Sequence, residues 1–296
     1  MARRYALVHS SGAMVSETLS LQLGGCWWAL VGPAVLLEHI QEWAGGFATR
    51  QAPAHSRQDN YWLHIEVDDE PCARAERTPY VSTLEPVLDA KSDTFRLYVH
   101  WASSEGRLLL RRETLSLAGF AIAPPVASAL KTLTSLLYLR RRGALLHAAS
   151  VLWNGRGYCF LGRSGAGKST LAEMFPREAV LNDELTGVIP ESNQIILEST
   201  PFFGTMRNGE KCFRRGVLER ACWLEKSQEC RLTPLDNAAA LRAALRCIVV
   251  PSGVEPMVRR GFAVAEDLVE NCEWYRLDFR KQQSAILGCL QPKEAS

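Results

Sequence analysis

The sequence predicts an α/β protein, α+β overall, in which a β-rich N-terminal region precedes a phosphate-loop domain. Short runs of β-branched and aromatic residues recur through roughly the first 120 residues. Apolar residues then recur at helical spacing over 124–139, and a strand, a glycine-rich loop and a helix are predicted over 158–175. We therefore expect two units, residues 1–122 and residues 123–296.

Composition and charge are those of an ordinary globular protein. Apolar residues make up 47% of the chain and charged residues 22%, and the formal net charge is only +2. A nucleic-acid-binding protein usually has a strong basic excess, so we expect no nucleic-acid partner. The nine cysteines are odd in number and form no C-x-x-C pair, which favours free thiols in a reducing cytoplasm. The N-terminus lacks the apolar stretch of a secretion signal, which also favours a cytoplasmic location.

The N-terminal region is predicted to be mostly β. The segments WLHIEV (62–67) and FRLYVHW (95–101) are typical of strands, and a helix is expected near 33–43. The apolar segment 26–40 is too short to span a bilayer and is broken by Gly32-Pro33, so it predicts a buried strand, a turn and a helix, with no membrane partner. The acidic residues 68–70 precede Pro71 and indicate a solvated turn rather than a metal site.

The segment 124–139 predicts one amphipathic helix. Pro125 suits its first turn, the arginines at 140–142 suit its C-terminal end, and Gly143 suits the position just past that end. The same arginines could bind phosphate or nucleic acid, but helix termination explains them without a ligand.

The elements around the loop follow closely on one another. The segments 144–153 and 158–162 predict two strands joined by a tight turn at Asn154-Gly155. A short helix is expected over 169–175, where Pro176 ends it, and the next strand over 179–185. Further along, Asp236 is expected to cap a helix that runs to Ile248.

The segment GRSGAGKST (162–170) contains the G-x-x-x-x-G-K-[ST] spacing of a nucleotide-binding phosphate loop. Glycines let backbone N–H groups approach the phosphates, Lys168 is expected to reach the β- and γ-phosphates, and the Ser169 hydroxyl to bind Mg²⁺. The sequence therefore predicts ATP and Mg²⁺ as cofactors. The expected nucleotide-binding residues are Gly162, Arg163, Ser164, Gly165, Ala166, Gly167, Lys168, Ser169 and Thr170.

An acidic pair follows the loop unusually early. Asp183 and Glu184, in LNDEL, lie only 15 and 16 positions after Lys168. Most phosphate-loop enzymes place the metal-binding carboxylate on a later strand. The sequence also lacks the signatures of transporter ATPases, GTPases and eukaryotic-type protein kinases.

These features together resemble the HPr kinase/phosphorylase family, whose catalytic domain shares its loop arrangement with phosphoenolpyruvate carboxykinase. The matching pieces are LHAASV (146–151), NGRG (154–157), the loop, and LNDEL (181–185). A weaker likeness in TPFFG (200–204) is similar to HPr-kinase-like proteins encoded with peptide-modifying genes, some of which phosphorylate a peptide on serine. The resemblance thus implies a divergent, HPr-kinase-like domain and a serine kinase activity.

The resemblance also implies roles for individual residues. His147 matches a family histidine that lies near the catalytic carboxylate. Asp183 matches the first acidic residue of the family and would hold the metal with Ser169. Glu184 matches the second acidic residue, which takes the proton from the substrate hydroxyl. The predicted catalytic residues are His147, Lys168, Asp183 and Glu184. His147 could instead be a core residue of its strand. The family usually has Asp-Asp at the pair, so the sequence leaves open which carboxylate is the base.

Other features of the family are missing or unassigned. We find no glycine-rich segment with an additional metal-binding glutamate and no arginine-proline signature for contact with HPr, so the resemblance favours an HPr-kinase-like protein over the HPr regulator and leaves reverse phosphorylase activity open. A further cation could come from 206–215, which could also be a solvated loop or an acceptor-binding surface. The candidates are Arg207, Lys211, Arg214 and Arg215.

The sequence therefore predicts an ATP-dependent kinase that phosphorylates a hydroxyl of a peptide or small protein, which is its expected partner. Three alternatives remain: a non-catalytic or regulatory ATP-binding module, a small-molecule hydroxyl kinase, and carboxykinase-type chemistry. HPr kinases assemble as hexamers, so the resemblance permits a homo-oligomer. The role of 1–122 and the identity of the acceptor stay open.

Overall fold

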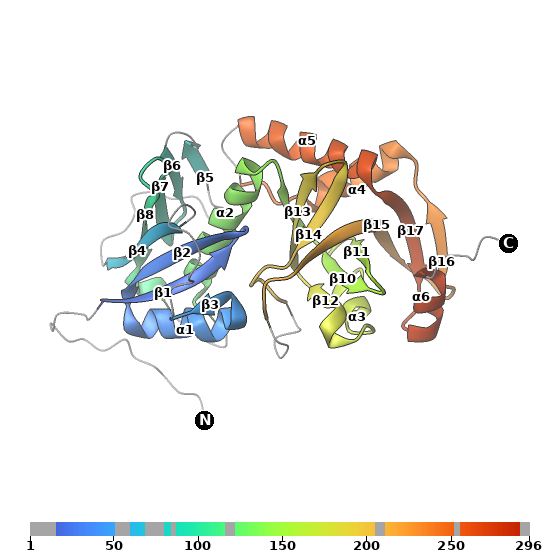
Figure 1. Cartoon of the computed structure of the whole chain (residues 1–296), viewed down its shortest axis with the longest axis horizontal. Helices are drawn as coiled ribbons and strands as arrows, with labels where there is room; N and C mark the ends of the chain where they lie inside the picture. The colour runs from blue at the N-terminus through green and yellow to red at the C-terminus, as the bar shows by residue number, and fades with distance from the viewer. Residues whose placement is uncertain are drawn as a thin grey trace, which may run out of the picture.

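The chain is a mixed α/β protein, which the computed structural model describes over residues 16–50, 60–68, 80–83, 87–115, 122–204, 211–251 and 255–290. Within these ranges it has two sheets and six helices, which confirms the α/β class that the sequence predicts (Figure 1). One sheet belongs to the first part of the chain and the other to the second part, and the helix α2 (Pro124–Arg140) lies between them.

The first sheet has eight strands in the order β3-β1-β2-β4-β8-β7-β6-β5. Its central pairs β2–β4 and β4–β8 are parallel and the remaining pairs are antiparallel. The strands are β1 Ser16–Leu23, β2 Cys26–Pro33, β3 Ala48–Thr49, β4 Asn60–Asp68, β5 Tyr80–Thr83, β6 Val87–Lys91, β7 Phe95–His100 and β8 Glu105–Arg111.

The expected strand and helix at 26–40 are confirmed as β2 and α1 (Ala34–Ala44). The strand continues through Pro33 into the helix without the turn that the Gly32-Pro33 pair predicts. Alternate residues of β2 are buried, and α1 buries one apolar face against the sheet through Leu37 and Ile40. Among the described residues, no helix is both long and apolar enough to cross a bilayer.

The second sheet has nine strands, with β12-β10-β11-β15-β14-β13-β9 as its main path and β17 pairing both β15 and β16. Its strands are β9 Ala144–His147, β10 Ala149–Trp153, β11 Arg156–Leu161, β12 Val180–Asn182, β13 Leu185–Glu191, β14 Gln194–Glu198, β15 Arg215–Lys226, β16 Arg231–Pro234 and β17 Glu273–Phe279. The remaining helices are α3 Lys168–Ala172, α4 Asn237–Cys247, α5 Glu255–Asn271 and α6 Gln283–Leu290, and three short 3₁₀ turns are η1 Gly45–Phe47, η2 Arg112–Thr114 and η3 Arg177–Ala179.

The segment 144–153 is two strands, where the sequence predicts one. Only Ala148 separates β9 from β10, yet the two strands lie near opposite ends of the main path, so the sheet curls until its ends meet. Side chains tie the ends together: the Ser150 and Thr186 hydroxyl oxygens are 2.8 Å apart, and Thr186 also donates to the Ala148 carbonyl at 3.2 Å. The predicted hairpin is present, with Asn154 and Gly155 both at positive φ.

The helix α2 is not amphipathic, in contrast to the prediction, because it packs against strands of both sheets. Its polar residues are buried as well: the Thr134 hydroxyl donates to the Leu130 carbonyl at 2.7 Å, and the Ser135 hydroxyl to the Val249 carbonyl at 2.6 Å. These internal hydrogen bonds satisfy the hydroxyls, so residues that indicate an exposed face in the sequence lie in the core.

The end of α2 also differs from the prediction. The left-handed residue is Arg142, with φ of 58°, and not Gly143. Glycine is required at 143 because a Cβ there would lie 2.4 Å from the Val188 carbonyl oxygen. Arg140 stacks on the Trp101 ring at 4.2 Å, and Arg141 pairs with the buried Glu198 at 3.3 Å and donates to the Gly24 carbonyl. The arginine run therefore joins α2 to both sheets.

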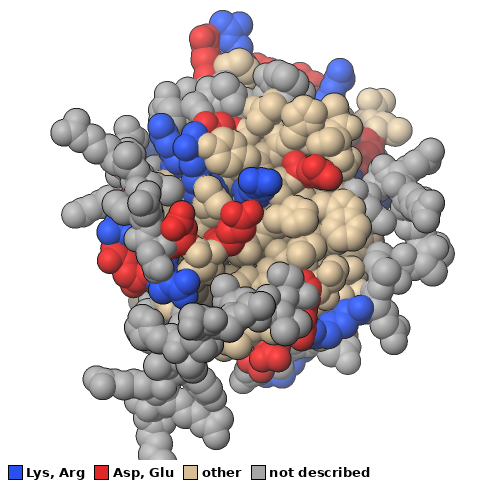
Figure 2. Space-filling view, turned by 90° about the vertical axis from the view of Figure 1, so that its left-hand side faces the viewer, with Lys and Arg blue, Asp and Glu red and all other residues tan. Residues whose placement is uncertain are grey.

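Further predictions from the sequence can be compared with the structure. Asp236 caps α4 by accepting from the Ala239 N–H at 2.7 Å. The eight described cysteines are free thiols, and Cys72 lies outside the described residues. On the face in Figure 2, acidic and basic side chains alternate around the visible tan surface, in keeping with the nearly balanced net charge. Of the acidic residues 68–70, Asp68 ends β4 and the other two lie outside the described ranges.

Candidate functional site

The glycine-rich segment forms the connection between β11 and α3. Gly165 and Gly167 have φ of 75° and 101°, which glycine adopts readily, and the Ala166 N–H donates to the Arg163 carbonyl at 3.1 Å to close the turn. The tip of the loop at 163–165 is exposed. Gly167 also needs to lack a side chain, because a Cβ there would lie 2.9 Å from the Phe279 ring.

Lys168 begins α3 and is buried, with its amine turned back into the loop. Its Nζ donates to the Gly162 carbonyl at 3.0 Å and to the Arg163 carbonyl at 3.3 Å. Burial lowers the pKa of Lys168 below the usual lysine value, since a charged amine loses solvation there. The helix is shorter than predicted and ends at Ala172 rather than near Phe175. Ser169 and Thr170, the last two predicted loop residues, lie in its first turn and are half-buried.

The acidic pair lies between two strands, because the strand predicted over 179–185 ends at Asn182 as β12 and β13 begins at Leu185. Asp183 is buried, and its Oδ1 accepts from the Gly204 N–H at 2.8 Å. The Ser169 hydroxyl donates to the Asp183 backbone carbonyl at 3.3 Å, which places the two predicted metal ligands beside each other. Glu184 is half-buried and is salt-bridged to Lys131 of α2, with its Oε1 2.8 Å from the Lys131 Nζ.

Both carboxylates face the same space beside Gly204. A Cβ built on Gly204 would lie 3.2 Å from the Asp183 Oδ2 and 3.6 Å from the Glu184 Oε2, so glycine keeps this space open between them. A hydroxyl and a carboxylate are ligands that Mg²⁺ prefers, and Mg²⁺ at nucleotide sites uses one or two carboxylates with phosphate oxygens and water. Ser169 and Asp183 therefore fit a Mg²⁺ ion by chemistry, and the hydrogen bond from Ser169 to the Asp183 backbone keeps the two residues adjacent. No cluster of three or more His, Cys, Asp or Glu suited to a metal occurs in the described ranges.

His147 lies next to the acidic pair because of the strand pairing. It ends β9 opposite Leu185 of β13, and the neighbouring Ala148 N–H donates to the Glu184 carbonyl at 3.0 Å. The imidazole is open to solvent on one side, and the protein atoms around it lower its pKa below the usual 6.5. The positive charge of Lys168 lowers the pKa further and the negative charge of Glu184 raises it, so both groups are near the imidazole. The site histidine is thus not a core residue.

The described cation candidates of 206–215 bond to groups other than the acidic pair. The Arg214 guanidinium donates to the carbonyls of Glu178 and Val180, and Arg215 pairs with Glu191 at 2.7 Å. Lys211 donates to the Trp43 carbonyl at 2.6 Å. Arg207 lies outside the described residues.

Two residues of this site are absent from the sequence prediction. Lys131 is the only basic residue in 124–139, and a single lysine in an apolar helix is the signal that could have indicated it. Asn182 is fully buried, and its side chain accepts from the Thr200 N–H at 2.7 Å and donates to the Thr200 and Phe202 carbonyls at 3.0 and 3.3 Å. It fixes the segment TPFFG beside the acidic pair, and nothing in the spacing predicts this role.

Comparison with known proteins yields a weak structural match. No protein-family model matches the chain, and no curated protein matches it. Among solved structures, the Hpr(Ser) kinase/phosphatase from Coxiella burnetii aligns with 49% of this chain and 93% of its own, at 12% sequence identity and a TM-score of 0.30. Because the identity and the TM-score are both low, the functional argument below depends on the geometry of the site alone.

Proposed function

We propose that the protein is an HPr-kinase-like enzyme that transfers the γ-phosphoryl group of ATP to a serine hydroxyl of a peptide or small protein. One observation carries the proposal: Lys168, the Asp183-Glu184 pair and His147 come from three separate elements and meet around one loop. Phosphoryl transfer needs cationic groups at the phosphates and a carboxylate at the acceptor, and this set supplies both.

In this proposal the loop and its first helical residues bind the triphosphate. The loop N–H groups and the Lys168 amine stabilise the charge on the β- and γ-phosphates. The amine now bonded to the Gly162 and Arg163 carbonyls would exchange these partners for phosphate oxygens. Ser169 and Asp183 would hold Mg²⁺, which neutralises charge on the phosphates when bound.

The proposal assigns the proton transfer to Glu184. Asp183 is buried, and its Oδ1 accepts a hydrogen bond from the Gly204 N–H. Glu184 is half-buried and lines a cavity between α1, α2 and the segment 202–203. Glu184 accepts the proton of the serine hydroxyl while the serine oxygen forms a bond to the γ-phosphorus and the bond from that phosphorus to the β,γ-bridging oxygen breaks. ADP and the phosphoserine are the products. The lowered pKa of His147 keeps the imidazole neutral near pH 7, so it can orient Glu184 by hydrogen bonding without adding a positive charge.

The test is transfer of label from γ-labelled ATP to serine-containing peptides. We expect Lys168→Ala to abolish transfer and Glu184→Gln to slow it about 100-fold or more while ATP affinity is retained. Lys91→Ala, at the half-buried end of β6 in the first sheet, is the matched control for loss of a lysine and is expected to leave transfer unchanged. Transfer at the wild-type rate in Lys168→Ala would refute the assignment of kinase activity to this site, and a wild-type rate in Glu184→Gln would refute Glu184 as the base. A protein that binds ATP and transfers label to no peptide would instead fit the regulatory module.

A further inference from the structure

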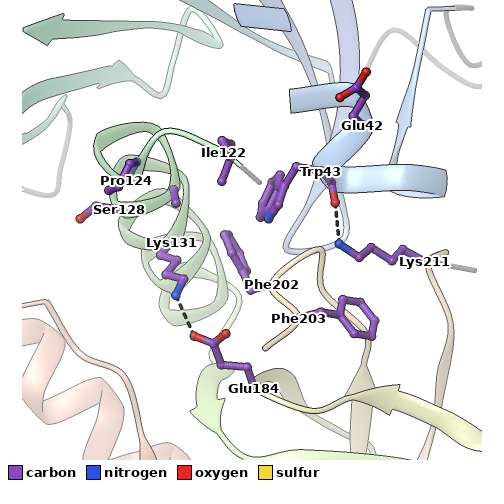
Figure 3. A pocket seen from close by; sticks show the side chains of 11 residues that line it. Glu42, Trp43, Ile122, Pro124, Ser128, Lys131, Glu184, Phe202, Phe203 and Lys211 are labelled. Carbon is purple, nitrogen blue, oxygen red and sulfur yellow. Dashed lines mark hydrogen bonds and ion pairs between the residues drawn. The ribbon is translucent and has the colours of Figure 1, made fainter. Parts of the chain in front are cut away.

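A cavity lies beside the carboxylate pair, between the first and second parts of the chain (Figure 3). Its volume is about 690 Å³, which is within the range of small-molecule and side-chain binding pockets. Its walls come from α1, α2, the segment 202–203 and Lys211, and Glu184 lies at one end.

The walls of the cavity are mainly apolar. Trp43 of α1 and Phe202 are both buried and pack against each other with ring centroids 5.4 Å apart, so the edges of the two rings form one wall, and Ile122 and Ala127 lie on the side of α2. Phe203 is half-buried and extends this surface toward Lys211. Aromatic and aliphatic walls of this kind favour an uncharged, bulky group.

The two lysines that line the cavity have protein partners. Lys131 pairs with Glu184 at 2.8 Å and lies 5.9 Å from the Phe202 ring centroid. Lys211 donates to the Trp43 carbonyl at 2.6 Å and lies over the Phe203 ring at 5.4 Å. Glu42 and Glu184 also line the cavity and balance the two lysines, so the lining carries no net positive charge that would attract an anionic side chain.

The cavity continues to the proposed proton acceptor. Glu184 lines it, and the Glu184 Oε2 and the Asp183 Oδ2 share the open space beside Gly204, the residue that follows Phe202 and Phe203. A ligand held by the aromatic walls therefore has one end at the carboxylates and, through Asp183 and Ser169, next to the phosphate loop.

We propose that this cavity binds the acceptor peptide and selects a bulky apolar side chain, aromatic or aliphatic, in the residue adjacent to the phosphorylated serine. The inference rests on the proposed kinase function. It gives the first part of the chain a role in recognition, because α1 contributes Trp43 to a cavity whose other walls belong to the ATP-binding part.

The test uses synthetic peptides in which one serine is flanked by alanine, tryptophan, leucine or aspartate, with binding and transfer measured separately. Binding is measured calorimetrically in the presence of a non-hydrolysable ATP analogue. Transfer is measured with γ-labelled ATP. We expect tryptophan and leucine peptides to exceed the alanine peptide about tenfold or more in kcat/KM, and the aspartate peptide to be the poorest.

Two variants test the walls from opposite directions. Phe203→Ala removes a half-buried ring and should abolish the preference for bulky peptides. Ala127→Phe places a ring into the cavity from half-buried α2 surface and should raise KM for bulky peptides without raising KM for ATP. The matched control is Trp62→Ala. Trp62 is 45% exposed on β4, and its ring does not line the cavity. Melting temperatures check that each variant is folded.

The outcomes separate this inference from the kinase proposal. Transfer that ignores the flanking residue, or variants that match Trp62→Ala, would refute the acceptor cavity and leave the kinase intact. Binding that prefers bulky peptides and requires Phe203, without transfer to any peptide, would refute the kinase and support the cavity as a peptide site. Absence of both binding and transfer would refute both.

Discussion

His147 is the titrating group on which the electrostatics of the site can be measured. Because burial and the charge of Lys168 lower its pKa, we expect an NMR titration midpoint below 6.5 for its Cε1 proton. Lys168→Ala should raise this midpoint, since it removes a positive neighbour, and Glu184→Gln should lower it further. The signal is assigned by its loss in His147→Gln. A midpoint that neither substitution moves would place the imidazole away from both groups.

The same shift affects stability. Between the lowered pKa and 6.5 the unfolded chain binds more protons at this histidine than the folded chain, so the free energy of unfolding rises with pH across that window. We expect urea unfolding of His147→Gln to depend less steeply on pH there than that of the wild type. Equal slopes would contradict a lowered pKa in the folded state.

The site residues that could be predicted from the sequence belong to short local motifs. The loop and the acidic pair are each short contiguous segments, and the structure places the Ser169 hydroxyl beside the Asp183 carbonyl as expected for neighbours on successive elements. Lys131 and Trp43 reach the site only through tertiary packing, from positions 53 and 141 residues away from Glu184. Their roles could not be predicted because no local pattern encodes such a distance.

At the scale of elements, the contact between α2 and β13 depends on Gly187. A Cβ on Gly187 would lie 2.1 Å from the Tyr138 hydroxyl oxygen, which itself donates to the buried Glu198 at 3.2 Å. We expect Gly187→Ala to destabilise the protein by about 2 kcal/mol or more, because the helix must move away from the strand. Gly288→Ala in α6 meets nothing within 4 Å and is expected to stay within about 1 kcal/mol of the wild type. Thermal unfolding compares them, and equal melting temperatures would contradict the close packing.

The existence of most elements could be predicted, whereas their partners could not. The hairpin at Asn154-Gly155 and the cap at Asp236 are local features and are confirmed. The separation of β9 from β10 at Ala148 is not visible in the sequence, because both halves of 144–153 are equally apolar and the division comes from pairing with different strands. The amphipathic prediction for α2 was wrong over 132–139, where every residue is buried, whereas Ala127, Ser128 and Lys131 stay half-buried beside the cavity.

At the scale of the whole molecule, the two parts share a core. Buried residues of the first sheet, of α2 and of the second part, such as Leu185 and Phe202, form one apolar cluster. The boundary between the two units, at 122 and 123, stays a prediction. The helix α2 begins directly after this boundary and contacts strands of both sheets. We therefore expect a fragment that begins at Pro124 to expose the buried face of α2 and to unfold without a cooperative transition in urea, measured by circular dichroism. A fragment with the midpoint of the full chain would show that the second part folds independently.

The fold class follows from the order of strands and helices, and the structure confirms a mixed α/β protein. The curl of the second sheet could not be predicted because it arises from pairing between strands that are distant in sequence, such as β9 with β13 and β11 with β15. The cavity between the parts could not be predicted because it arises from packing across more than 100 residues. These are the features that bring His147 to the acidic pair and Trp43 to the proposed acceptor.

The position of Trp43 has a consequence for how such a protein evolves. The cavity wall on α1 is encoded about 120 residues before the phosphate loop, and the two share no contiguous segment. If the protein has the proposed function, substitutions in α1 change which acceptor is chosen while the residues of the loop stay under separate selection. On the proposed function, a lineage could acquire new substrates by drift in this helix alone.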